Sequence, residues 1–420
     1  MKHFTTFLTL GLLVSVLYFV PNAFDNSIWI GLVALVYSIA VIFQVKGETQ
    51  LVILFSIIFY INLSAFILGP VSRGLLFGAY QYDIWNSQYN TIGMKCILIT
   101  SVIFYLFFRS KRKREIEQKG KNVVSLSDKQ NPFVSIVCLI AVLLICTYSF
   151  DGSVSRDEYQ SNTSAIYEYV IFIMVLAWYY GGKNTFIKLF WVFCALYYVL
   201  MGILSGDRSS AFMLLTLIAL YKFRDISIGK ILFFTLLGIF AANSVALYRE
   251  GAFSGGIGLQ MYAQGLKSFF SDTAAQSYYS GLTIFYYLDK VGDGVTIFFK
   301  WVLSLFTGSL FIDRSAVELS KLAADLNPNG GGGFFQSMFY SFYGYLGVAM
   351  GSSIVAYIIK KVFYSWKNTF SLLLAFVIPV MSFRWYLYTP TTFFRACLLN
   401  FGIMYLATKA FNTFVHNKKR

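Results

Sequence analysis

Long apolar stretches recur along the whole chain, and they constrain its fold more than any other feature. Twelve of them are long enough, or nearly so, to cross about 30 Å of hydrocarbon as an α-helix. They lie at residues 4–20, 28–44, 51–69, 91–108, 132–150, 165–181, 184–204, 209–221, 229–247, 335–359, 369–388 and 392–412. Backbone in lipid must satisfy its hydrogen bonds internally, so these stretches predict helices. The sequence therefore predicts an all-α polytopic membrane protein, with residues 1–420 as a single integral membrane domain.

The distribution of charge predicts how these helices cross the membrane. With the amino terminus in the cytoplasm, most lysines and arginines fall in inner loops and most acids in outer loops, as the positive-inside rule requires. Residues 109–131 then form a basic cytoplasmic loop, residues 248–334 form one large outer loop that we expect to contain short helices, and both termini are cytoplasmic. The net charge of +15 therefore indicates membrane topology and contact with membrane lipids, not nucleic acid binding.

Three segments need a separate interpretation. The first apolar run, residues 4–20, is followed by a poor cleavage site, so we expect it to remain as the first span. Residues 294–311 are apolar, but Lys300 lies at their centre and another crossing would reverse the later loops. We expect an interfacial or re-entrant helix there. The glycines of residues 327–333 are interpreted as a flexible hinge, because no GK[ST] motif follows them.

Arginines gather on the predicted outer side, against the usual charge bias. Most of them adjoin the ends of predicted helices. They are Arg73, Arg208, Arg249, Arg384 and Arg395, with Arg314 in the large loop. One interpretation is ion pairing, for example with Asp207, Glu250 or Asp313, or contact with lipid headgroups. The other is an anionic ligand, because the planar guanidinium suits phosphate.

The hexapeptide from Ser205 to Ser210 adds local geometry to this choice. Ser205 or Asp207 can cap the following helix, and Gly206 permits a tight turn. The free amide groups at the start of that helix would then face the same place as Arg208. Helix amides together with a guanidinium would make a phosphate site, although a capped turn would have the same sequence.

The remaining residue types restrict the chemistry. The two histidines, His3 and His416, lie at the termini, the five cysteines form no CxxC pair, and the outer segments contain no DxD pair. We therefore expect no metal and no cofactor. A lipid diphosphate that carries a sugar would supply both the anion and the leaving group, and arginines would stabilise the departing diphosphate. Glu250 is our first candidate for the general base and Asp313 the second, although each could be an ordinary ion-pair partner.

The sequence resembles the bacterial oligosaccharide repeat-unit polymerases, the Wzy-type O-antigen polymerases. The resemblance rests on Gly206-Asp207-Arg208-Ser209 between two apolar runs, on Tyr248-Arg249 at the start of the large loop, and on the overall hydropathy pattern. The segment Gly344-Tyr345-Leu346-Gly347, after the loop, is also similar.

The resemblance implies a GT-C-like fold and a membrane glycosyltransferase of lipopolysaccharide and polysaccharide biosynthesis. Such an enzyme transfers a growing glycan from undecaprenyl diphosphate to the next lipid-linked repeat unit, at the periplasmic face of the inner membrane. Arg208 and Arg249 would contact the diphosphate. The resemblance identifies no base, and it leaves a polysaccharide chain-length regulator open as a partner.

Two other functions remain as alternatives. The related O-antigen ligases share the plan but carry a histidine in the large outer loop, and this chain has none there, which favours a polymerase. A lipid-linked oligosaccharide flippase or other transporter would also have about twelve helices. Carriers usually place charged residues or broken helices near the midplane, whereas the intramembrane charges here lie near helix ends.

Overall fold

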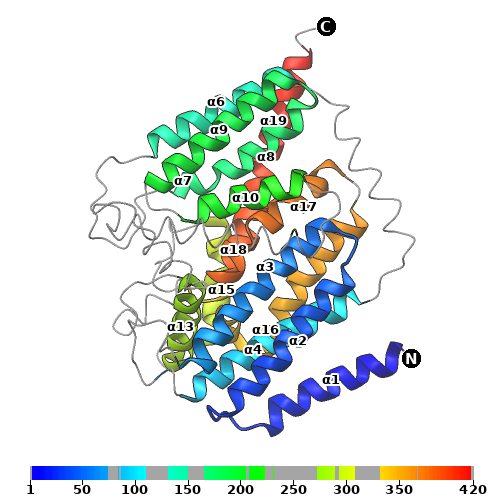
Figure 1. Cartoon of the computed structure of the whole chain (residues 1–420), viewed down its shortest axis with the longest axis vertical. Helices are drawn as coiled ribbons and strands as arrows, with labels where there is room; N and C mark the ends of the chain where they lie inside the picture. Colours follow the sequence, from blue (N-terminus) through cyan, green and yellow to red (C-terminus); the bar gives the residue numbers. More distant parts are fainter. Residues whose placement is uncertain are drawn as a thin grey trace. The chain divides into compact units, whose positions relative to one another are not determined.

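The computed structural model describes residues 2–73, 84, 87–109, 131–149, 165–204, 208–222, 230, 272–288, 293–307, 332–366 and 368–417 (Figure 1). Within these residues every regular element is a helix, so the all-α prediction is confirmed for them. Among the described residues, five helices are long and apolar enough to cross a membrane, by length and composition. They are Asn26–Gln44, Thr49–Val71, Gln88–Phe108, Thr185–Gly202 and Phe335–Ser365. The chain is a helical membrane protein.

The chain forms two compact units. Unit 1 comprises Met1–Lys111, Phe270–Ser365 and Ser382–Arg395, and unit 2 comprises Arg112–Phe269, Trp366–Met381 and Ala396–Arg420. The predicted run at residues 229–247 lies outside the described residues, except for Lys230.

Unit 1 is built around a group of long apolar helices. Its described helices are α1 (Lys2–Phe19), α2 (Asn26–Gln44), α3 (Thr49–Phe66), the π-helix η1 (Ile67–Val71), α4 (Gln88–Phe108), α13 (Asp272–Tyr286), α15 (Gly294–Thr307), α16 (Phe335–Lys360), the π-helix η8 (Lys361–Ser365) and α18 (Ser382–Leu387). The central helix α4 packs against α1, α2, α13 and α16. Helix α2 comes so close to its neighbours at Gly31 that a side chain there would overlap Phe66. Tight packing of this kind holds helices together where lipid supplies no hydrophobic drive.

The two ends of unit 1 can be told apart by their contacts. At one end, the Phe108 ring packs on Phe55, near the start of α3, and on Tyr364 in η8. We call this the Tyr364 end. At the other end, α1 and α3 finish and α2 and α4 begin, and Thr91 Oγ1 donates to the backbone O of Ala23 at 2.5 Å. We call this the α13 end, because α13 packs there against η1 and α4.

Unit 2 has its own helical core. Its described helices are α6 (Pro132–Tyr148), α7 (Ala165–Glu168), α8 (Val170–Gly181), α9 (Thr185–Leu204), α10 (Arg208–Lys222), α17 (Thr369–Val380) and α19 (Phe401–Asn417). Tyr221 stacks on Trp178, with ring centroids 4.5 Å apart, and contacts Phe376 at 5.0 Å. These aromatic contacts join α8, α10 and α17. The π-helix η9 (Thr392–Asn400) begins in unit 1 and ends in unit 2.

Several of the predicted spans are interrupted in the structure. Helix α16 contains two residues with non-helical backbone, Tyr343 and Gly344, and Gly344 has a φ of 58°. The predicted run at residues 369–388 is divided into α17 and α18 at Met381, just after Pro379. Proline, glycine and π-helical turns are the usual causes of such breaks. The hydropathy of these runs did not predict the breaks.

Two helices lie within the described part of the expected large loop, residues 248–334. Helix α15 buries Ile297, Trp301 and Ser304, and Trp301 Nε1 donates to Thr391 Oγ1 at 2.8 Å. Lys300 is exposed. Helix α13 is buried from Ala274 to Phe285, although it carries serines, a threonine and a glutamine. Helix α13 is therefore part of the core of unit 1.

Candidate functional site

Arg208 is the first residue of α10. Helix α9 ends at Leu204, and residues 205–207 and the Arg208 side chain lie outside the described part. The two helices approach closely at Gly202, where any side chain would overlap Ser210 Oγ. Ser210 is fully buried. The backbone of Arg208 therefore stands at the start of a helix in a tightly packed helical pair.

Four of the predicted site residues lie outside the described residues. They are Arg249, Glu250, Asp313 and Arg314. Their roles as diphosphate ligands and as general base therefore remain predictions.

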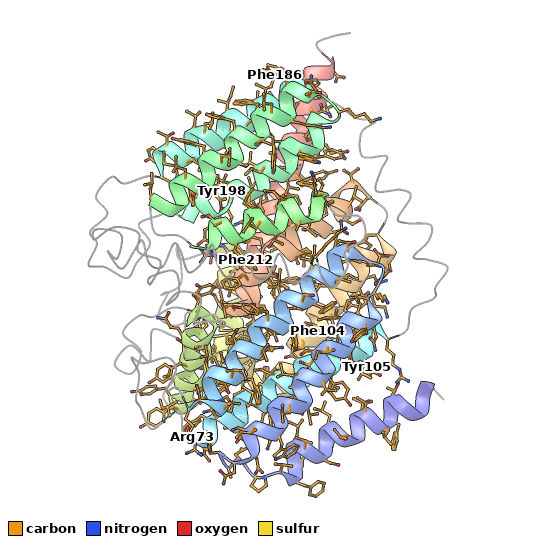
Figure 2. All side chains as sticks on the ribbon, viewed as in Figure 1. Arg73, Phe104, Tyr105, Phe186, Tyr198 and Phe212 are labelled. Carbon is orange, nitrogen blue, oxygen red and sulfur yellow. The ribbon has the colours of Figure 1, made fainter. Side chains whose placement is uncertain are left out.

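Arg73 lies at the α13 end of unit 1, directly after η1 (Figure 2). Its backbone has a φ of 52°, in the left-handed region, and its amide donates to the backbone O of Gly69 at 2.8 Å. The guanidinium carbon lies 4.9 Å from the centroid of the Phe24 ring, and the side chain is exposed. The left-handed conformation costs a residue other than glycine roughly 1–2 kcal/mol. The guanidinium is thus held at the end of a helix and open to a ligand.

Arg384 lies on the short helix α18, whose other side chains are firmly anchored. Trp385 and Tyr386 are fully buried, whereas Arg384 is half-buried. The guanidinium carbon of Arg384 lies 5.3 Å from the centroid of the Tyr388 ring. The backbone of Tyr388 in turn leaves no room for a side chain at Gly332. The glycine tract therefore approaches Tyr388 closely at Gly332, whereas residues 327–331 lie outside the described residues, so its interpretation as a flexible hinge stays a prediction.

A chain of buried polar side chains fixes α18 in unit 1. Gln336 Nε2 donates to Tyr386 Oη at 2.7 Å, and Tyr386 Oη donates to Asn62 Oδ1 at 2.9 Å. The chain continues from Asn62 Nδ2 to Ser38 Oγ at 3.4 Å, which lies 2.8 Å from Ser101 Oγ. Such bonds between helices hold a membrane core together. They fix the backbone that carries Arg384.

Arg395 lies on the π-helix η9 and is half-buried. Its neighbour Phe394 packs edge-on against Trp301 of α15, with ring centroids 5.5 Å apart. Segments of π-helix occur often at functional positions. Arg73, Arg384 and Arg395 all belong to unit 1. Their neighbouring aromatic residues differ: Phe24 for Arg73, Tyr388 for Arg384, and for Arg395 the adjacent Phe394.

Lys95 of α4 is a buried cation whose environment the sequence did not reveal. Its Nζ donates to the backbone O of Val20 at 2.7 Å, to Asn22 Oδ1 at 2.8 Å and to the backbone O of Leu17 at 3.3 Å. These acceptors use the three protons of the ammonium group. Leu17 is also among the last residues of α1, where a positive charge is favourable. Lys95 therefore has a structural role at the α13 end and is no candidate for an anion ligand.

Tyr278 is the main residue at this end that sequence reasoning missed. Its hydroxyl donates to Asn90 Oδ1 at 3.0 Å and lies 3.2 Å from the backbone O of Asn90. The side chain lies against Gly69 and Gly93: a Cβ atom would come within 2.8 Å of the ring at Gly69 and within 2.7 Å of the hydroxyl at Gly93. Small residues in two predicted spans could have indicated a close neighbour, but nothing in the sequence identified that neighbour as a residue of the large loop.

Within the described residues, no three His, Cys, Asp or Glu side chains form a group that could hold a metal ion. No family model, no curated protein and no solved structure matches the chain.

Proposed function

We propose that the chain is a metal-independent glycosyltransferase, an O-antigen polymerase that joins undecaprenyl-diphosphate-linked oligosaccharide repeat units. In this proposal it has twelve spans in a GT-C-like arrangement, with both termini in the cytoplasm of a bacterium. The active site faces the periplasm from the inner membrane. The observation that carries the proposal is the position of Arg208 as the first residue of α10, in a close pair with α9. A diphosphate can be bound there by helix amides and a guanidinium together.

The reaction assigns a role to each predicted residue. A sugar hydroxyl of the acceptor repeat attacks the anomeric carbon of the donor glycan, and the bond from that carbon to the diphosphate oxygen breaks. Glu250, or Asp313 in its place, takes the proton of the attacking hydroxyl. Arg208 and Arg249 stabilise the negative charge on the departing undecaprenyl diphosphate.

The arginines of unit 1 would serve the anionic part of the same substrates. Arg73 is exposed, and Arg384 and Arg395 are half-buried, so each can present its guanidinium to a phosphate group. Arg314 would join them from the large loop. Lys95 has no part in this role, because its ammonium protons are bonded to Leu17, Val20 and Asn22.

A lipid-linked oligosaccharide flippase is the second candidate, and one observation favours it. Helix α16 is broken at Tyr343 and Gly344. Discontinuous helices are typical of transporters, in which the break lies at the substrate site. A flippase would move the lipid-linked repeat unit across the bilayer without joining repeats.

Reconstitution distinguishes the two candidates. The full chain is placed in proteoliposomes with a purified undecaprenyl-diphosphate-linked repeat unit, and without nucleotide or added metal. We expect products longer than one repeat unit. If only transbilayer movement occurs, the flippase replaces the polymerase, and if neither occurs, both proposals fail.

Single substitutions then test the site. We expect Arg208→Ala and Arg249→Ala to lower polymerisation roughly tenfold to a hundredfold, because each removes a charged hydrogen-bond donor. Lys222→Ala is the matched control, since it removes a cation from the opposite end of α10. If the arginine variants insert and fold normally and keep full activity, the diphosphate must bind elsewhere.

A further inference from the structure

Three tyrosines meet at the α13 end of unit 1. The ring of Tyr286, at the end of α13, lies edge-to-face with Tyr287, with centroids 5.0 Å apart and planes at 89°. It also lies edge-to-face with Tyr89, near the start of α4, at 5.8 Å and 81°. Tyr286 is 49% exposed, and Tyr89 and Tyr287 are half-buried. We call Tyr89, Tyr286 and Tyr287 the tyrosine cluster.

The backbone beneath the tyrosine cluster is held rigidly. The hydroxyl of Tyr278, two turns earlier in α13, is bonded to Asn90, the residue after Tyr89. The Tyr287 amide donates to the backbone O of Thr283 at 3.1 Å and of Ile284 at 3.2 Å. The Tyr89 amide donates to Ser87 Oγ at 3.3 Å, which caps α4. The rings therefore meet a ligand with little loss of conformational freedom, as rigid aromatic side chains do in binding sites.

The cluster lies at the same end of unit 1 as Arg73. The Arg73 amide is bonded to the backbone O of Gly69, and Gly69 packs against the Tyr278 ring. This end therefore combines a guanidinium, which suits phosphate, with aromatic rings and phenolic hydroxyls. The C–H face of a sugar ring packs well on an aromatic ring, and the sugar hydroxyls bond to phenolic groups. A glycan attached to a diphosphate needs both kinds of contact.

We infer that the tyrosine cluster is a binding site for the glycan of the lipid-linked substrate. The inference rests on the proposed function, which supplies the substrate class. The competing occupant is the headgroup layer of the bilayer, since tyrosines also gather at membrane interfaces. Two observations favour the glycan. The Tyr286 ring is nearly perpendicular to both the Tyr89 ring and the Tyr287 ring, and two of the three tyrosines come from the segment that begins with α13 and not from a predicted span.

The test measures glycan binding without turnover. The probe is the lipid-free polysaccharide released by mild acid from the source bacterium, titrated against the purified full chain in detergent. We expect Tyr286→Ala to weaken binding roughly tenfold. Tyr286→Phe keeps the ring and should stay within about threefold of the wild-type affinity.

The matched control is Tyr18→Ala, because Tyr18 is an exposed tyrosine near the end of α1. We expect it to bind the glycan as the wild type does. If Tyr286→Ala fails to fold, Tyr286→Leu tests the same loss of the ring. Wild-type affinity in a folded Tyr286→Ala or Tyr286→Leu variant would overturn the inference, as would an equal loss in Tyr18→Ala, which would indicate a membrane-interface role.

The outcomes separate this inference from the proposed function. If the wild-type chain binds the glycan through Tyr286 but makes no polymer in proteoliposomes, the inferred glycan site stands and the proposed polymerase function fails. If the wild-type chain makes polymer and the Tyr286 variants bind glycan and react as the wild type does, the polymerase function stands and the inferred glycan site fails.

Discussion

Arg73 shows how far single residues could be predicted from the sequence. Its place after a predicted span marked it as a candidate ligand, and the structure holds it exposed at the end of η1. Its left-handed backbone was not predictable, because the sequence offers a glycine at the next position, residue 74, which would adopt that conformation more easily. A strained residue that could have been glycine is a reason to look for a function.

Arg73→Gly removes the guanidinium and leaves the left-handed backbone in place, so it tests the side chain alone. Glycine adopts a φ of 52° without strain, so we expect the free energy of unfolding to stay the same or rise by up to about 1 kcal/mol. Loss of the charged donor should lower polymerisation roughly tenfold or more. Thermal unfolding in detergent and polymer synthesis in proteoliposomes measure the two effects. Full activity in the glycine variant would remove Arg73 from the substrate site.

Tyr386 is a residue of structural importance that the sequence did not single out. Its hydroxyl joins Gln336 and Asn62 in the buried core of unit 1, and Phe in its place would leave both amides without that bond. We expect Tyr386→Phe to lower the free energy of unfolding by about 1–2 kcal/mol. The control is Tyr357→Phe, at an exposed tyrosine of α16, which should unfold as the wild type does. Equal stability of the two variants would contradict the structural role of the hydroxyl.

At the scale of elements, hydropathy located the apolar helices but neither their breaks nor the packing of α13. The break at Gly344 lies inside an otherwise continuous apolar run, and a hydropathy average does not respond to one backbone conformation. Helix α13 carries Ser277, Ser280 and Thr283, which are typical of an exposed loop helix, yet all three are buried. Tertiary packing decided both cases, and sequence patterns within one segment do not contain that information.

Gly93→Ala tests whether α13 is held by close packing. The new Cβ would lie 2.7 Å from the Tyr278 hydroxyl, so Tyr278 or α4 must move and the bond to Asn90 must weaken. We expect a loss of about 1–3 kcal/mol in the free energy of unfolding. Gly11→Ala is the control, because apart from its chain neighbours and the nearby backbone of α1 no atom lies within 4 Å of the added Cβ. A Gly93→Ala variant as stable as the Gly11→Ala variant would show that α13 is not fixed by Tyr278.

At the scale of the whole molecule, contacts within each unit join helix ends that the sequence assigns to the same side of the membrane. In unit 1, the start of α3, the end of α4 and η8 meet through Phe55, Phe108 and Tyr364, and all three are predicted inner ends. In unit 2, Asn131 before α6 donates to Asn412 Oδ1 of α19 at 2.7 Å, and both are predicted inner ends. These contacts each join helix ends that charge counting places on one side, and the topology itself remains a prediction.

Cysteine labelling tests that prediction, and the chain suits the method because all five native cysteines are buried. A membrane-impermeant maleimide is applied to intact spheroplasts that carry single introduced cysteines at exposed positions. We expect Pro21→Cys and Asp293→Cys to react from outside, and Lys46→Cys and Lys183→Cys only after permeabilisation. Trp366→Cys decides whether α15 crosses the bilayer: an extra crossing would expose this position, 42% accessible after η8, to the outside. We expect it to react only from inside, because the charged Lys300 lies at the centre of α15, where a transmembrane helix disfavours a charge. Labelling from outside would mean that α15 is a span and that the later loops and the carboxyl terminus are reversed.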